Sequence, residues 1–352
     1  MKRWLFFFSL WSISQTYAQT NRLDDLCQVF HLPDGKDTTT FIVFGTKEDL
    51  KVKKPLFLFR QGSQPMPLIV QDSGKYYIIA SSFHFRTYKD SYHFVMVQKP
   101  GVRLVATQQF LDNYQKAMRT GNVTPEFISQ KYIENNYRER YVAQCNRVIN
   151  YLIKQPWVDT HKVVFCGGSE GFTVGADLVA NYNRHITHTI LFSGHSGRRF
   201  ENPIYSTRQQ IDKGEISPEE GQKQIESLYA WWADIQKHPT ALTNSPGDTY
   251  RAWKSFSIRN LDNLLRISVP LYIAYGTADK EIAPGLDYLP LEFIEKGKTN
   301  LTLKAYHDHD HQFFKLKRDS TGQIIDKEYN GEAVAKDWME WLDQKAIKTS
   351  LK

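Results

Sequence analysis

Residues 163–172 read VVFCGGSEGF, and this stretch decides how the chain folds. It begins with β-branched and aromatic residues, which predict a short buried strand. Beyond Gly171 the apolar residues take a helical spacing, with Val174 and Leu178 on one face. Ser169 is therefore expected in an abrupt strand-to-helix turn, in a strained conformation, with its hydroxyl at the helix N-terminus. The flanking glycines are expected because side chains there would collide with the neighbouring strand and helix.

The rest of the chain alternates between strand-like and helix-like segments around this turn. Strands are predicted at residues 38–46, 54–60, 76–85, 92–98, 186–193, 269–275 and 301–306. Helices are predicted at residues 132–154, around residues 291–295 and near the C-terminus from residue 333, and a polar hairpin should turn at 320–322. This order predicts an α/β fold: a mostly parallel central sheet flanked by helices.

The turn carries the pattern Gly167-x-Ser169-x-Gly171, which resembles the nucleophile elbow of the α/β-hydrolase superfamily. The resemblance implies that Ser169 is the nucleophile of a serine hydrolase. A plain glycine-rich turn is the alternative. Asp279 and His311 follow Ser169 in the order expected for this superfamily. Asp279 comes directly after a predicted strand, in the wording Tyr-Gly-Thr-Ala-Asp-Lys, which resembles the loop of the catalytic acid.

Three histidines alternate near the end of the chain, at His307, His309 and His311. His311 is the favoured base because His-Gln-Phe after an acidic residue resembles the corresponding ending in the superfamily. A base is needed because a serine hydroxyl is a poor nucleophile at neutral pH. One alternative is that His307 or His309 is the base. Two others are that all three histidines are solvated loop residues, or that they bind zinc. Three ligands on one flexible stretch are a weak zinc signature, so we predict no metal.

The resemblance also implies an oxyanion hole built from backbone N–H groups. One donor would come from the Gln61-Gly62-Ser63 turn after the strand at 54–60, where Gln61-Gly62 replaces the usual His-Gly sequence. The second would be the N–H of Glu170. The Glu170 carboxylate is unusual beside a developing oxyanion, and Arg60, Arg198 or Arg199 could pair with it. Alternatively, these arginines bind an anionic group of the substrate.

Residues 198–268 hold many charges and helix-like stretches but no convincing strand. Many α/β-hydrolases carry a helical cap at this point, so we expect a cap or lid at 198–268 on a core of residues 19–197 and 269–352. A plain surface insertion is the alternative. Trp231 and Trp232 are candidates to line a substrate pocket.

The N-terminus has the pattern of a signal peptide, with a basic start, an apolar run and a small-residue cleavage site near Ala18. Residues 1–18 are therefore expected to be removed on export to the periplasm or beyond the cell. The apolar run is too short to span a bilayer, so no stable membrane insertion is expected. Removal of Lys2 and Arg3 lowers the formal charge from +7 to +5. Basic and acidic residues are interspersed, which argues against nucleic-acid binding.

Composition is ordinary for a globular protein, with 41% hydrophobic and 24% charged residues, and 352 residues suffice for one large domain. The three cysteines leave at least one thiol unpaired within the chain; a Cys27–Cys145 bridge is one possibility.

The sequence thus predicts an exported serine hydrolase that cleaves an ester or similar acyl bond in a small-molecule or short acyl or peptidyl substrate, with no external cofactor. A peptidase or amidase with the same triad, and a binding protein on an inactive hydrolase scaffold, are the alternatives.

Overall fold

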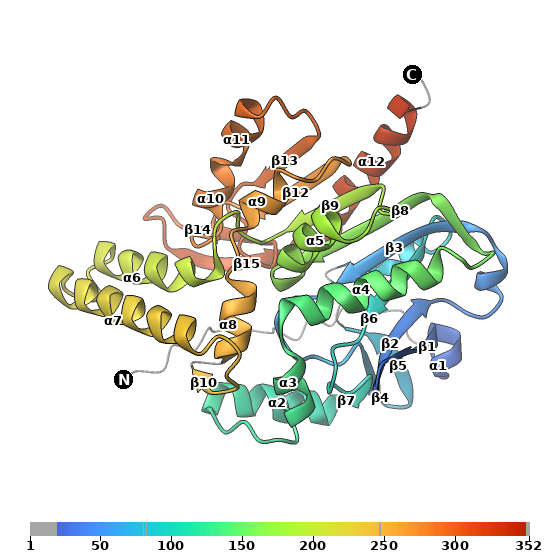
Figure 1. The fold of residues 1–352 in the computed structure, drawn as a ribbon, viewed down its shortest axis with the longest axis horizontal. Coiled ribbons are helices and arrows are strands. Elements are labelled where there is room, and N and C mark those ends of the chain that lie inside the picture. The colour runs from blue at the N-terminus through green and yellow to red at the C-terminus, as the bar shows by residue number, and fades with distance from the viewer. Residues whose placement is uncertain (1–19, 80, 82, 246–247, 350–352) are drawn as a thin grey trace.

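A computed structural model describes residues 20–79, 81, 83–245 and 248–349. The signal-peptide prediction falls on residues 1–18, outside these ranges. Figure 1 shows a central sheet with helices on both sides and a pair of helices, α6 and α7, projecting from the body.

The central sheet has eight strands in the order β1-β2-β6-β3-β8-β9-β12-β13. Their bounds are Cys27–Asp34 (β1), Asp37–Phe44 (β2), Lys54–Arg60 (β3), His93–Val97 (β6), Val158–Gly168 (β8), His188–Phe192 (β9), Leu271–Gly276 (β12) and Leu301–Tyr306 (β13). Strand β2 is antiparallel to both of its neighbours, and the pairs from β6 to β13 are parallel. Parallel strands end at one edge of a sheet, so the segments that follow β3, β8, β9 and β12 meet there.

Smaller strands lie outside the central sheet. They are Ile69–Asp72 (β4), Lys75–Ile78 (β5), Val105–Thr107 (β7), Asn244–Ser245 (β10), Asp248–Thr249 (β11), Phe314–Arg318 (β14) and Ile324–Tyr329 (β15). The last two form the hairpin that the sequence predicts around residues 320–322.

The α-helices are Leu23–Leu26 (α1), Gln108–Thr120 (α2), Gln130–Asn135 (α3), Arg138–Leu152 (α4), Glu170–Asn181 (α5), Asn202–Asp212 (α6), Pro218–Lys237 (α7), Tyr250–Phe256 (α8), Asn260–Leu264 (α9), Ala283–Asp287 (α10), Leu289–Glu295 (α11) and Gly331–Thr349 (α12). Short 3-10 turns lie at Asp49–Lys51, Phe85–Tyr88 and Arg199–Glu201.

Two apolar cores cover the two faces of the sheet, as a parallel sheet requires. Leu56 and Leu58 of β3 join the core under α4, α5 and α9, whereas Phe57 and Phe59 join the core under α12. This alternation follows from the two-residue period of a strand. The fold is the predicted α/β-hydrolase fold, with its central strands buried on both faces.

Two predicted elements differ from the structure. The helix expected over 132–154 is divided at Asn136 into α3 and α4, because the Asn136 amide donates to Asp248 at 2.8 Å and its oxygen accepts from the Tyr141 hydroxyl at 2.9 Å. The strand expected over 76–85 is limited to β5, which ends at Ile78. The three cysteines all lie in described segments, and each is a buried free thiol, so Cys27 and Cys145 are not bridged.

Candidate active site

Ser169 lies between β8 and α5, at the carboxyl end of the central sheet. Its backbone has φ 55° and ψ −114°, a conformation that costs a non-glycine residue free energy and persists only where the surroundings hold it. A Cβ at Gly167 would lie 2.3 Å from the Gly171 carbonyl oxygen, and one at Gly171 would lie 2.4 Å from that of Arg60. The two glycines therefore let helix, strand and neighbouring loop approach closely enough to hold the turn.

Asp279 and His311 meet after the two last strands of the sheet, β12 and β13. His311 Nδ1 donates to Asp279 Oδ2 at 2.5 Å, which fixes the tautomer and leaves Nε2 to accept a proton. The Asp279 side chain is 9% exposed and that of His311 29% exposed, so the acid is shielded while the base remains accessible. This is the arrangement in which a carboxylate orients an imidazole and stabilises its cation.

The end of β9 connects this pair to the nucleophile. The Ser169 N–H donates to the Phe192 carbonyl at 3.0 Å, and the next residue, Ser193, donates from Oγ to the His311 carbonyl at 2.7 Å. Phe192 and Ser193 thus fix the backbone of both the predicted nucleophile and the predicted base.

The charges around His311 set its basicity. Burial by itself lowers the pKa of His311, but the Asp279 charge and hydrogen bond, with help from Glu281 and Asp310, outweigh burial and raise the pKa above its ordinary value. Glu281 itself is unusual, because burial and the Asp279 charge raise its pKa to about 7, against the opposing effect of His311. Beside Asp279, the site therefore holds a further carboxyl group, that of Glu281, whose pKa is near neutral.

The three alternating histidines have different surroundings. His307 is exposed, whereas His309 is buried, with Nδ1 donating to the His307 carbonyl at 2.8 Å and Nε2 accepting from Asn330 at 2.8 Å. His311 alone of the three contacts Asp279. Within the described ranges, no cluster of three or more His, Cys, Asp or Glu side chains has the geometry of a metal site.

The predicted oxyanion loop lies against Ser169, the predicted nucleophile. A Cβ at Gly62 would be 3.4 Å from Ser169 Cβ and 3.8 Å from its Oγ, so Gly62 leaves room for the loop backbone at the reacting atom. Gln61 is buried, and the Ser63 carbonyl accepts two hydrogen bonds from side chains behind the site. That the N–H groups of this loop and of Glu170 donate to an oxyanion at Ser169 stays a prediction.

The prediction that an arginine pairs with Glu170 is wrong. Lys99 forms this ion pair, with Nζ 2.8 Å from Glu170 Oε1. Arg60 is fully buried, with its guanidinium over the Tyr141 ring, so it is not accessible to an anionic substrate either. Arg198 is 48% exposed and lies 3.7 Å from Glu201. Arg199 instead pairs with Asp248 at 2.7 Å.

Two polar residues of this region are not found by the sequence patterns. Lys99 comes shortly after the apolar run Phe94–Val97, and a charged residue in that position is the signal that could have indicated it. His195 lies just past β9, near Asp279, His311 and Arg199. Burial lowers the pKa of His195 to about 4, and its Nδ1 donates to the Gly197 carbonyl at 3.0 Å. It is therefore a neutral imidazole beside the Asp279–His311 pair at physiological pH.

Residues 198–268 form helices α6 to α9 and two very short strands. Trp231 and Trp232 on α7 pack against Phe200, and Trp231 also packs edge-on against Trp253 of α8. This aromatic cluster is a small core in which α7 packs against Phe200, just before α6, and against Trp253 of α8. The structure therefore gives the two tryptophans a packing role, and their contact with a substrate stays a prediction.

The fold is that of the α/β-hydrolases, and its site holds a strained serine turn and an Asp–His pair, the residue types that a serine hydrolase uses. The sequence profile described as "Dienelactone hydrolase family" matches residues 247–345, which include Asp279 and His311. No curated protein matches the sequence significantly.

Several solved structures are similar to this chain at low sequence identity. A membrane phospholipase A, described as a bacterial virulence factor, matches 92% of this chain and 88% of its own at 13% identity and a TM-score of 0.50. The acylaminoacyl peptidase of Pyrococcus horikoshii matches 81% of this chain at 13% identity and a TM-score of 0.48, and this chain covers 37% of that peptidase. A Klebsiella pneumoniae protein assigned as a dienelactone hydrolase matches 81% of this chain and 87% of its own at 9% identity and a TM-score of 0.45. In the part of the chain that the structure describes, no helix combines the length and apolar character needed to cross a bilayer.

Proposed function

We propose that the chain hydrolyses carboxylic esters or similar acyl bonds through an acyl-enzyme on Ser169. The observation that carries the proposal is the connection of three parts at the carboxyl end of the sheet: a strained Ser169, the Asp279–His311 pair, and the β9 end that fixes both. The match of residues 247–345 to a dienelactone hydrolase profile supports an ester substrate, because a lactone is a cyclic ester.

In the proposed reaction, Ser169 Oγ attacks the carbonyl carbon of the ester while His311 Nε2 takes the serine proton. The carbonyl oxygen becomes an oxyanion, which accepts hydrogen bonds from the N–H groups of the 61–63 loop and Glu170. His311 then returns the proton to the leaving alcohol, and the acyl group stays on Ser169. A water molecule, activated in the same way by His311, releases the carboxylic acid and restores the serine.

A panel of matched esters and amides tests the substrate class. We expect measurable turnover of short aryl and alkyl esters and at least a hundredfold lower kcat/KM on the amides, because a poor amine leaving group needs better protonation in the transition state. The measurement is kcat/KM for each ester–amide pair. Equal or faster amide cleavage would assign the site to a peptidase or amidase, and no turnover of any member would favour a binding protein on a hydrolase scaffold.

We further propose that α6 and α7 act as a cap over the acyl site. The pair projects from the body (Figure 1), and its base is held by Asp248, which accepts from Arg199 at 2.7 Å and from Asn136 at 2.8 Å. Replacing residues 202–237 by a short linker should change the ratio of kcat/KM on bulky and small esters by tenfold or more, because a cap shapes the pocket and leaves the triad in place. An unchanged ratio in a folded, active deletion variant would contradict the cap.

The export of the protein is also part of the proposal. It is supported by the sequence of residues 1–18 alone. N-terminal sequencing of the mature protein tests it, and the proposed cleavage gives Gln19 as the first residue.

A further inference from the structure

A buried cation lies behind the predicted oxyanion hole. Lys99 is the second residue after β6, and its side chain is 0% exposed. Its Nζ donates to the Ser63 carbonyl at 2.8 Å and to Glu170 Oε1 at 2.8 Å. Ser63 and Glu170 belong to the two backbone segments that flank Ser169. One ammonium group therefore connects both halves of the oxyanion hole.

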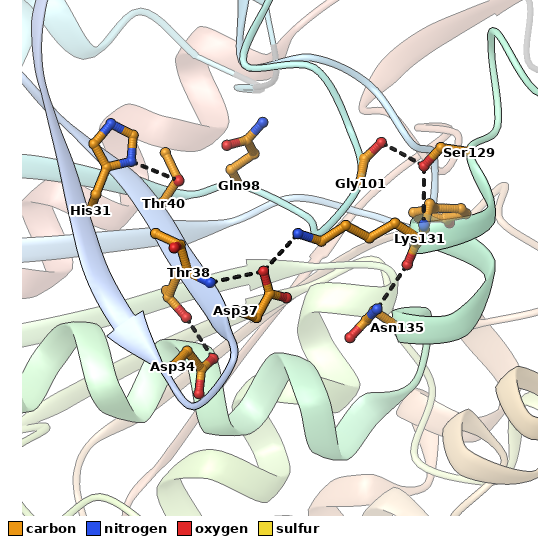
Figure 2. Close-up of polar contacts among 12 residues, drawn as sticks. His31, Asp34, Asp37, Thr38, Thr40, Gln98, Gly101, Ser129, Lys131 and Asn135 are labelled. Carbon is orange, nitrogen blue, oxygen red and sulfur yellow. Dashed lines mark hydrogen bonds and ion pairs between the residues drawn. The ribbon is translucent and has the colours of Figure 1, made fainter.

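Further contacts hold this ammonium in place. The Tyr132 hydroxyl of α3 donates to the same Ser63 carbonyl at 3.2 Å. The N-terminus of α3 is in turn fixed to the turn that follows Lys99, because Ser129 Oγ donates to the Gly101 carbonyl at 2.8 Å (Figure 2). On the outer side of α3, Lys131 pairs with Asp37 of β2 at 2.6 Å (Figure 2). Lys99 is thus held by the contacts of its own ammonium group, and the turn that follows it is held by Ser129.

The ionisable groups around Lys99 come from several elements. They are Glu170 of α5, Arg60 of β3, Asp248 of β11, and the phenols of Tyr132 and Tyr141. Burial raises the pKa of both phenols far above the ordinary value, so they are neutral. Glu170 is thus the carboxylate in direct contact with Lys99, and Arg60 adds a second positive charge nearby.

A carboxylate side chain at Glu170 creates a problem for the proposed reaction. Its own backbone N–H is a predicted donor to the oxyanion, and in a dry site two negative charges repel each other far more strongly than in water. An uncompensated Glu170 would therefore raise the energy of the tetrahedral intermediate. Lys99 removes this repulsion and also anchors the loop that carries the other donors.

We propose that Lys99 is a positioning residue of the oxyanion hole, which holds the 61–63 loop against Glu170 and neutralises the Glu170 carboxylate during acyl transfer. This inference rests on the proposed function, because it assigns Lys99 a role in the same acyl transfer at Ser169. Lys99 acts through the backbone of its partners and does not touch the substrate.

The first test separates this role from a purely structural one. A buried ion pair contributes little net stability, and its replacement by apolar or neutral groups is often tolerated, whereas removal of one partner leaves an unpaired charge. We therefore expect Lys99→Met to lower kcat on esters by about a hundredfold or more, the loss typical of a damaged oxyanion hole. The double variant K99M/E170Q removes the unpaired charge, so it should melt within a few degrees of the wild type. It should still show at least a tenfold lower kcat, with KM changed less than threefold, because the anchor to Ser63 is gone.

The second test uses pH. Burial lowers the pKa of Lys99 to about 8, although Glu170 opposes this effect. Above pH 8 the wild type should therefore lose the compensating charge, and kcat should fall. Glu170→Gln keeps an acceptor for Lys99 but has no charge to compensate, so the alkaline fall in kcat, measured relative to the kcat of the same variant at pH 7, should disappear. A purely structural Lys99 would give the same alkaline behaviour in both proteins.

Ser169→Ala is the reference that separates the two proposals. Loss of turnover in Ser169→Ala combined with wild-type kcat in folded K99M/E170Q overturns the role of Lys99 and leaves the proposed function standing. The same alkaline fall in the wild type and Glu170→Gln also overturns it. Undiminished turnover in Ser169→Ala overturns the proposed function and the role of Lys99 together.

Discussion

Ser169→Ala should lower kcat on esters by at least about a thousandfold while the fold stays intact. The covalent route requires the hydroxyl, and only substrate binding and oxyanion stabilisation remain without it. Alanine keeps the Cβ that Ser169 already accommodates at φ 55°, so no new backbone strain is introduced. The measurements are steady-state kcat, the melting temperature and the circular dichroism spectrum.

Ser169→Gly is the matched control for the strain at this position. Glycine adopts a positive φ without the steric cost of a Cβ, so this variant should be equally inactive but more stable than the wild type by about 1 kcal/mol. An organophosphonate probe should label the wild-type protein on Ser169 and neither variant. Wild-type turnover in a folded Ser169→Ala protein would end the serine-hydrolase interpretation.

The central fold could be predicted because its information is local. The run from Val163 to Phe172 combines a buried strand, a glycine-flanked serine and a helix within ten residues, and a parallel sheet follows from the strand–helix alternation around it. Asp279 could be located because it directly follows a buried strand, and such positions gather at one edge of a parallel sheet. The Asp279–His311 hydrogen bond then follows from the neighbouring positions of β12 and β13.

The features that the sequence did not reveal depend on contacts between distant residues. Lys99 is 36 residues from Ser63 and 71 residues from Glu170, so no local pattern indicates its partners. The interruption between α3 and α4 has the same origin, because Asp248 binds Asn136 across 112 residues. Strand β1 was missed for a different reason: Pro33 near its end weakens the strand pattern, but as an edge strand β1 tolerates the missing N–H.

The outer parts of the site also depend on packing that composition cannot specify. Aromatic residues in 198–268 suggested a substrate pocket, but Trp231 and Trp232 contact Phe200 within their own small core. An aromatic cluster on a helix pair can cover a ligand or fill an interior, and only the position of the partner rings distinguishes the two. Glu281 illustrates the converse, because an ordinary acidic residue of a loop becomes a near-neutral titrating group only through burial beside Asp279.

His311→Ala should be almost as damaging as the loss of the serine, with kcat lowered by about a thousandfold or more, because no base then takes the proton of the serine hydroxyl. The pH dependence identifies the base independently. A general base must be neutral to act, and Asp279 raises the pKa of His311 above the ordinary value of about 6.5 despite the opposite effect of burial. In the wild type, kcat/KM should therefore rise with pH through a midpoint above about 6.5. Asp279→Asn should move this midpoint to lower pH and also lower kcat.

The two neighbouring histidines provide the controls for this assignment. His307 is exposed, so His307→Ala should change kcat by less than threefold. His309 is buried and bonded to the His307 carbonyl and Asn330, so His309→Ala should lower the melting temperature while the folded protein keeps its kcat within about tenfold. If folded His309→Ala were inactive and His311→Ala active, the base would be misassigned. Loss of wild-type activity with a chelator and its return with zinc would instead favour the metal alternative, but the different partners of the three imidazoles argue against their convergence on one ion.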